Sequence, residues 1–457
     1  MTDRPNLLVI ILDSLRADHL PLYGYSKQTA PTLSRLAEEA CVYEQAIADG
    51  GWTPASVGAL FTGLCGREHN CEERTRLPEG MPTLAEVLQA TGYHTSALST
   101  NPYMLPVHGY GRGFTRFEEV RHGKGEIRAL RWLTKPLYLT DKGGRQLTET
   151  FLDALPDLPQ PFLSVLHYDE THCPYGARQP YTFRFANGGR TRLGQIATAL
   201  RAHRMYNFMT KASAADYEVL AGLYDGMIAY QDSLLAQILN SPAYAAVKDN
   251  TVVVVLADHG DLFGEDGYLG HSFGVNEGLL HVPLVIRAPG VLEPGSRAQG
   301  MVQLRDVGRS LASLAGAPPL DESSAPTVNV FSARSPEDGH QVTFCERRGF
   351  AQERVDREKR HQPAFDFDRH NVQIACARER RWKLVRNGRG ERRLYDLASD
   401  PREEHNLVDQ QRQEAQRLEK KLDEWLSGQA FYGFFPEDEG PVAPEVEQRL
   451  RDLGYMA

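Results

Sequence analysis

Two continuous apolar runs dominate the hydrophobic pattern of the chain, and each has the length of a strand. The first is NLLVIILD, beginning at Asn6, and the second is NTVVVVLADHGD, beginning at Asn250. Runs without polar alternation are typical of strands covered on both faces, as in a parallel sheet. PFLSVLHYD, from Pro161, predicts another strand of this kind.

Helical periodicity separates these strands. It is clearest in AADYEVLAGLYDGMIAYQDSLLAQIL, residues 214–239. TLAEVLQATGYHTSAL predicts a helix that ends at Gly92 and is followed by a short strand, and residues 29–47 predict a capped amphipathic helix. The alternation predicts an α/β fold with a mostly parallel, doubly wound sheet, whose polar side chains gather at the carboxyl ends of the strands.

The pattern changes after the turn-rich stretch GAPPLDESSAP. HQVTFCERRGF, NVQIACARERRWKLVRNG and RRLYDL then predict short antiparallel strands, and QQRQEAQRLEKKLDEWLSGQ predicts a helix. We therefore expect a large domain over residues 1–320 and a smaller α+β subdomain over residues 335–457. The pattern of residues 119–215 is irregular and predicts no helix or strand for most of that segment.

Composition and charge exclude several classes of protein. The 457 residues are 41% hydrophobic and 24% charged, which is typical of a globular protein, and the net charge of −9 argues against nucleic-acid binding. No stretch approaches the ~18 apolar residues of a membrane span, and the N-terminus lacks the basic region of a signal peptide. The six cysteines form no C-x-x-C pair, so we expect a cytoplasmic protein with reduced thiols.

Four residues at predicted strand ends and at one helix mouth could converge on chemistry. Asp13 closes the first strand, Asp258 and His259 close the second, and Thr53 opens a helix in GGWTPASVGALFTG. We expect Thr53 to be the N-cap, with Pro54 at the first helical position. The mixed oxygen and nitrogen donors suit Zn²⁺ or Mn²⁺ better than Ca²⁺ or Mg²⁺. A metal bound at Thr53 would lower the pKa of its hydroxyl and make it a nucleophile.

Two further histidines fit around this centre. His172, in LHYDETHCPY, and His271, in GYLGHSFG, could hold an anionic oxygen or protonate a leaving group. Each residue alone has a plainer structural explanation, and we expect His167, His69 and His281 to be structural.

A second metal ion is not expected. Asp225 and Asp232 lie at helical spacing in YDGMIAYQD and are interpreted as helix residues, so the sequence favours a single ion.

The order of these motifs resembles the sulfatase branch of the alkaline phosphatase superfamily over most of the chain. The resemblance rests on NLLVIILDSLRADHLPLYGY, TPASVGALFTGL, TGYHTSALSTNPYM, GYGRGFTRFEE and LYDLASDPREEHNL, and most specifically on VVVVLADHGDLFGEDGYLGHSFGVNEGLLHVPLVIRAPG. It implies an α/β/α sandwich with a smaller C-terminal subdomain that holds a short antiparallel sheet and a helix. It implies that Asp13, Asp258, His259 and Thr53 bind the metal, that Thr53 is the nucleophile, and that Asn101, His172 and His271 meet the substrate.

The departures from that family pattern bear on the reaction. Sulfatases carry Cys or Ser in a Cys/Ser-x-Pro-x-Arg frame that is oxidised to formylglycine, whereas this chain has Thr53 followed by Val57 at the arginine position. We expect no formylglycine, because the extra methyl group of threonine would give a ketone. Ser14 also replaces the second aspartate of the first motif, and His259 replaces the asparagine of the metal pair.

These departures favour a metal-dependent phosphoester hydrolase that acts on phosphodiesters or phosphonate monoesters through a phosphothreonine. The alternatives are a sulfatase that works without formylglycine, a soluble phospho-group transferase, and an inactive member retained for binding. The expected substrate is a small anionic ester, with specificity in residues 119–215 and in the arginine-rich C-terminal strands. The sequence leaves a homo-oligomer open.

Overall fold

The central element of the computed structural model is a mostly parallel eight-stranded sheet in the order β12-β2-β11-β7-β1-β6-β4-β5. The structure describes residues 4–71, 76–120, 141–176, 178–206, 212–271, 273–321, 327–349, 355–356, 359–360 and 366–428. The strands of this sheet are β1 (Asn6–Leu12), β2 (Cys41–Tyr43), β4 (His94–Ser99), β5 (Arg116–Glu119), β6 (Phe162–Tyr168), β7 (Thr251–Leu256), β11 (Leu284–Arg287) and β12 (Ser296–Ala298). The predicted α/β class and parallel sheet are confirmed.

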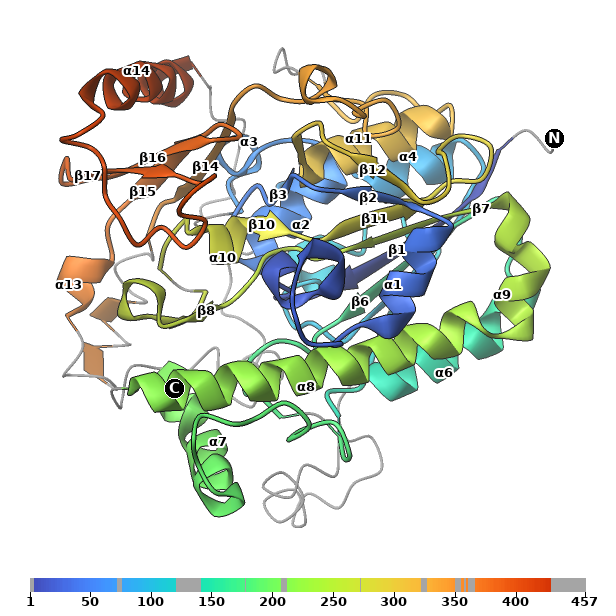
Figure 1. Cartoon of the computed structure of the whole chain (residues 1–457). Helices are drawn as coiled ribbons and strands as arrows, with labels where there is room; N and C mark the ends of the chain where they lie inside the picture. Colours follow the sequence, from blue (N-terminus) through green and yellow to red (C-terminus); the bar gives the residue numbers. More distant parts are fainter. Residues whose placement is uncertain are drawn as a thin grey trace.

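The innermost strands are the apolar runs seen in the sequence. Every residue of β1, β6 and β7 is buried, and β1 pairs in parallel with β6 on one side and β7 on the other. Figure 1 shows why both faces are covered: α8 (Ala214–Leu239) and α6 (Gly144–Ala154) run along the lower side of the sheet, while α4 (Leu84–Ala90) and α11 (Leu304–Leu314) lie along the upper side. The arrangement is the expected α/β/α sandwich.

The helix predicted over residues 29–47 is wrong in its second half. Helix α1 covers only Pro31–Glu38, and the chain then forms β2 and the short strand β3 (Ala46–Ile47). The segment CVY has the β-branched and aromatic character of a strand, and β2 finds partners in β11 and β12. Tertiary pairing therefore overrides the apparent helical periodicity.

The sequence pattern assigned no element to most of residues 119–215. The structure has two helices there that the pattern did not predict, α6 and α7 (Arg192–Tyr206). Residues 121–140 of that segment lie outside the described residues. In Figure 1, α7 extends below the left end of α8, away from the central sheet.

A second sheet forms the C-terminal part of the described chain. It is antiparallel, in the order β14-β15-β16-β17, and has a hydrophobic cluster of its own against α14 (Arg412–Gly428). Its strands are β14 (Thr343–Arg347), β15 (Ile374–Arg378), β16 (Trp382–Asn387) and β17 (Arg392–Asp396). The tail beyond Gly428, which the sequence assigned to the same subdomain, lies outside the described residues.

All six cysteines are buried and none forms a disulfide. Among the described residues, no helix combines the length and the apolar character that a membrane crossing requires.

Candidate metal centre and nucleophile

Four neighbouring parallel strands end at one point of the sheet, and each delivers a polar side chain there. Asp258 follows β7, Asp13 follows β1, Asp169 follows β6 and Asn101 follows β4. All four side chains are almost completely buried. Because carboxyl ends of parallel strands share an edge, residues far apart in the sequence become neighbours.

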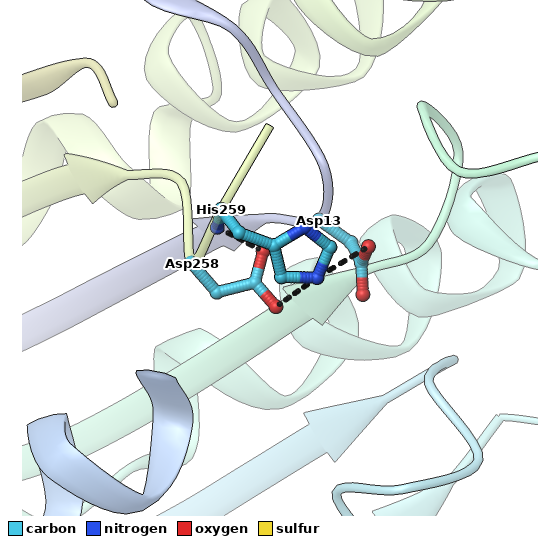
Figure 2. A group of neighbouring side chains, drawn as sticks. All are labelled: Asp13, Asp258 and His259. Atoms are coloured by element: carbon cyan, nitrogen blue, oxygen red, sulfur yellow. Dashed lines mark hydrogen bonds and ion pairs between the residues drawn. The ribbon is translucent and has the colours of Figure 1, made fainter. Parts of the chain in front are cut away.

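Asp13, Asp258 and His259 form a group whose potential ligand atoms all lie within 4.8 Å of one another (Figure 2). The Nδ1 atom of His259 lies 2.8 Å from the carbonyl oxygen of Gly260. A carbonyl oxygen only accepts hydrogen bonds, so Nδ1 carries a proton and the other ring nitrogen, Nε2, faces Asp258 Oδ2, 3.5 Å away. Burial opposes a charged ring, but the carboxylates of Asp258 and Asp13 raise the pKa of His259. A histidine that binds metal through Nε2 keeps its proton on Nδ1, as His259 does here.

The electrostatics of the two aspartates also fit a cation. Burial and the neighbouring charge of Asp13 raise the pKa of Asp258. Burial also acts to raise the pKa of Asp13, but the hydrogen bond with His167 and the nearby histidines outweigh it, so the pKa of Asp13 is lowered. Ser14 holds both carboxylates, with its backbone N–H 3.1 Å from Asp258 Oδ1 and its hydroxyl 2.6 Å from Asp13 Oδ1. A divalent cation would relieve the repulsion between these buried anions.

Thr53 is not the N-cap that the sequence predicted. Trp52 occupies the N-cap without a side-chain cap bond, and Thr53 is the first residue of α2 (Thr53–Thr62). Its hydroxyl oxygen instead lies 3.3 Å from Asp13 Oδ2 and 3.3 Å from His259 Nε2. The hydroxyl therefore faces the candidate ligands rather than the helix backbone.

His271 lies against this centre and is held by a carboxylate. Its Nδ1 atom is 2.8 Å from Asp261 Oδ1, and the hydroxyl of Tyr175 donates to the other oxygen of Asp261 at 2.6 Å. The ring of His271 is 4.4 Å from that of His259 and 4.9 Å from that of His172, measured between centroids. The structure thus brings both predicted substrate histidines beside the candidate metal ligands.

His172 and Asn101 have fixed orientations. His172 Nδ1 lies 2.5 Å from the carbonyl oxygen of Cys173, and burial, followed by the charge of His271, lowers the pKa of His172 to about 3. Asn101 accepts a hydrogen bond from the backbone N–H of Tyr103, so its Nδ2 atom points at Asp13 Oδ2, 2.5 Å away, and at Thr53 Oγ1, 3.4 Å away.

Three residues of this centre were not assigned to it from the sequence. His167, expected to be structural, places Nε2 3.4 Å from Asp13 Oδ2; Asp169 accepts from Asn101 at 3.5 Å; and Asp261 holds His271. The two-residue period of β6 could have indicated His167, because a strand side chain at position 167 points to the same face as the one at position 169.

The other ionisable residues weighed in the sequence lie elsewhere. Asp225 accepts from His19, Tyr25 and Lys27, and Asp232 accepts from the backbone at the start of α1. The Nε2 atom of His281 lies 2.9 Å from the carbonyl oxygen of Glu44, and the backbone N–H of Cys71 donates to His69. These contacts are structural.

Proteins named as sulfatases resemble the chain along most of its length. The uncharacterized sulfatase YidJ of Escherichia coli is 22% identical over 89% of this chain and 83% of its own length. A choline-sulfatase of Rhizobium meliloti is 21% identical over 90% of this chain and 84% of its own length.

Solved structures share the fold. A phosphonate monoester hydrolase of Agrobacterium radiobacter superposes with a TM-score of 0.73 at 22% identity, covering 93% of this chain and 95% of that one. A phosphonate monoester hydrolase of Silicibacter pomeroyi gives a TM-score of 0.70 at 20% identity, covering 93% and 94%.

Two family models match the sequence itself. The model described as N-sulphoglucosamine sulphohydrolase, C-terminal, matches residues 264–430. The sulfatase model matches residues 5–317, which hold the central sheet, the three candidate ligands and Thr53. The chain therefore belongs to the sulfatase family, whose members hydrolyse esters.

Proposed function

We propose that this protein is a metal-dependent phosphoester hydrolase that cleaves phosphodiesters or phosphonate monoesters through a covalent phospho-enzyme, with phosphorus bonded to Thr53 Oγ1. The observation that carries the proposal is the place of the Thr53 hydroxyl, 3.3 Å from both Asp13 Oδ2 and His259 Nε2 at the start of α2. Backbone N–H groups at the start of a helix favour an anionic substrate there.

The chemistry of the nucleophile favours phosphorus over sulfur. Threonine cannot yield formylglycine, and Val57, where the sulfatase frame has arginine, is buried and uncharged. An unmodified hydroxyl that attacks phosphorus leaves a phosphate or phosphonate ester of threonine, which water can hydrolyse in a second displacement.

The residues present fit a divalent cation. Asp258 Oδ2 is buried and accepts no hydrogen bond within the described part of the chain, and His259 directs Nε2, the ring nitrogen not bonded to Gly260, to the same space. Asp13, Asp258 and His259 would hold the ion, with Thr53 beside it, and their mixed donors favour Mn²⁺ or Zn²⁺. Such an ion supplies positive charge that lowers the pKa of a nearby hydroxyl.

The protein side chains then divide the remaining work. Thr53 Oγ1 loses its proton to solvent and forms a bond to phosphorus, and the bond from phosphorus to the departing alcohol breaks. His271, oriented by Asp261, protonates the departing oxygen, while the low pKa of His172 keeps that ring neutral, so that it orients the substrate by hydrogen bonding. Asn101 Nδ2 points into the same space and binds a non-bridging oxygen.

Hydrolysis of sulfate esters is the second candidate. Named relatives include a choline-sulfatase and a Δ4,5-hexuronate-2-O-sulfatase, and one neighbouring structure holds its substrate D-glucosamine-2-N,6-O-disulfate. The same buried centre could accept a sulfuryl group in place of a phosphoryl group, so the reaction must be measured on both ester classes.

The deciding experiment compares wild-type protein with Thr53→Ala and Thr53→Ser after loading with Mn²⁺ or Zn²⁺. Each is assayed on aryl phosphodiester, phosphonate monoester, phosphomonoester and sulfate ester substrates. We expect turnover of the diester or phosphonate that falls about 10³-fold or more in Thr53→Ala and survives in Thr53→Ser.

Thr62→Ala is the matched control, because the Thr62 hydroxyl of the same helix bonds only locally, to the carbonyl oxygen of Gly58 and the N–H of Leu64. Preferential turnover of sulfate esters would contradict the phosphoester proposal and support the second candidate, hydrolysis of sulfate esters. Equal activity of wild type and Thr53→Ala would remove Thr53 from the mechanism.

A further inference from the structure

A cavity of about 330 Å³ lies where the loop after His271 meets the C-terminal sheet. One wall is formed by residues 273–276, and the opposite wall comes from residues on α13 (Phe367–His370) and on β15–β17. In Figure 1, α13 and these strands lie beside β8 (Leu262–Phe263), which belongs to the segment that follows the metal-site strand. The volume is that of a pocket for a small organic ligand.

The segments that form the cavity wall are continuous in sequence with, or packed against, segments of the candidate catalytic centre. Phe273, in its wall, follows His271 by two residues. A Cβ atom on Gly51 would lie 3.3 Å from the carbonyl oxygen of Gly274, and Gly51 precedes Thr53 by two residues. A ligand in the cavity therefore lies next to segments that carry both the proposed nucleophile and the proposed acid.

The charges that face the cavity do not cancel locally. Asp266 pairs with Arg393 at 2.7 Å, and Glu403 pairs with the buried Lys383 at 2.9 Å, so these two acids are already neutralised. Within the described residues, no carboxylate forms an ion pair with Arg369 or Arg389, and both side chains are exposed.

The same two arginines act on a neighbouring histidine. Burial lowers the pKa of His370, and the charges of Arg369 and Arg389 lower it further, while Asp366 opposes them. The third acid of the lining, Glu391, accepts from Asn387 at 2.7 Å and forms no ion pair with either arginine within the same residues.

The rest of the lining suits an organic body rather than a bare inorganic ion. The rings of Tyr268 and Phe273 stack at 5.7 Å with an angle of 29° between them, and Arg347 lies over Phe273 at 4.8 Å. Asn276 and Asn387 add carboxamides that can bond to hydroxyl groups. Aromatic and apolar surface beside a few placed polar groups is the usual composition of a small-molecule site.

We propose that this cavity binds an organic anion of about monosaccharide size, with Arg369 and Arg389 holding its charged group. Guanidinium groups match planar carboxylates and other oxyanions through paired hydrogen bonds. One part of this proposal rests on the proposed function: the anion belongs to the part of the ester substrate that is remote from the bond that is cleaved.

Direct binding tests the cavity without turnover. Glucuronate, glucose 6-phosphate and glucose are titrated calorimetrically into metal-loaded wild-type protein and into the double variant Arg369→Ala/Arg389→Ala. We expect one or both anions to bind more tightly than glucose, and the double variant to lose about 10-fold or more in affinity for them. Arg380→Ala, which removes an exposed arginine that pairs with Glu44 outside the cavity, should bind as wild type does.

A kinetic arm then separates the two proposals. With two aryl phosphonate esters that differ by one carboxylate on the leaving group, the double variant should raise KM only for the charged ester and leave kcat unchanged. Equal affinity of wild type and double variant for both anions, or no preference for either anion over glucose, would overturn the cavity assignment. Anion binding lost in the double variant, together with no ester hydrolysis by wild type, would support the anion site and contradict the proposed function.

Discussion

The imidazole of His271, the proposed proton donor, is held by two buried side chains in sequence, Asp261 and Tyr175. Asp261 accepts from Tyr175 and faces His271 Nδ1 at 2.8 Å, which leaves His271 Nε2 directed away from the carboxylate and near the hydroxyl of Tyr206, at 3.4 Å. A carboxylate behind an imidazole fixes both its tautomer and its orientation. At the scale of single residues, Asp261 is thus a positioning residue for the proposed acid.

Replacement of Asp261 by asparagine should disturb orientation more than substrate affinity. The amide can donate to Nδ1 and favour the wrong tautomer of His271, so we expect kcat to fall about 10- to 100-fold with little change in KM. Steady-state kinetics on the best ester, with thermal melting of the same samples, measure both quantities. Tyr175→Phe, which removes only the outer hydrogen bond, should have a smaller effect. A loss of kcat that merely follows unfolding would contradict the assignment.

At the scale of elements, the place of Thr53 depends on how α2 packs against α11. Every residue of α2 is buried, and a Cβ atom on Gly308 of α11 would lie 1.9 Å from the carbonyl oxygen of Leu60. The two helices therefore approach so closely that only glycine fits at their contact. This close contact fixes the helix whose first residue carries the proposed nucleophile.

Gly308→Ala should destabilise the protein, although alanine is the better helix former. The extra methyl must push α2 and α11 apart, at a cost of about 1–3 kcal/mol in the free energy of unfolding. Gly428→Ala is the control, because no other described residue lies within 4 Å of a Cβ built on Gly428, and it should be neutral or stabilising by up to about 1 kcal/mol. Urea unfolding of both variants gives the comparison, and equal stabilities would show that the helices can separate without cost.

At the scale of the whole molecule, a buried ionic network joins the C-terminal sheet to the catalytic part. Lys383 of β16 lies 3.0 Å from Glu277 and 2.9 Å from Glu403, and Arg378 pairs with Glu277 at 3.0 Å. Glu277 begins α10 (Glu277–Leu280), which accepts a hydrogen bond from the N–H of Gly260, next to His259. The C-terminal sheet thereby supports the segment that carries a candidate metal ligand.

Lys383→Met should leave the buried carboxylate of Glu403 without its cation and Glu277 with Arg378 alone. We expect a loss of about 3–5 kcal/mol in the free energy of unfolding, measured by urea denaturation. Lys420→Met, which removes a surface lysine whose side chain is 80% exposed, should change stability by less than about 1 kcal/mol. A Lys383→Met protein as stable as wild type would show that the network does not hold the two parts together.

The contrast between predicted and observed elements follows from which interactions are local. Residues 214–239 form one helix with the predicted bounds, because helical periodicity is a property of neighbouring residues. Residues 41–47 also resembled helix, but they pair with strands more than 230 positions away. No local pattern contains such a partner.

The sequence by itself determined the α/β class, the central buried strands and the residue types that close them. A strand that is buried on both faces needs apolar side chains at successive positions, so it is visible as a continuous apolar run. The sequence also placed the protein in its family through ordered motifs. Only the tertiary structure decided that the Thr53 hydroxyl faces Asp13 and His259 instead of capping α2, and that Asp261 supports His271. Those contacts depend on strand order and on side-chain direction, which adjacent residues do not encode.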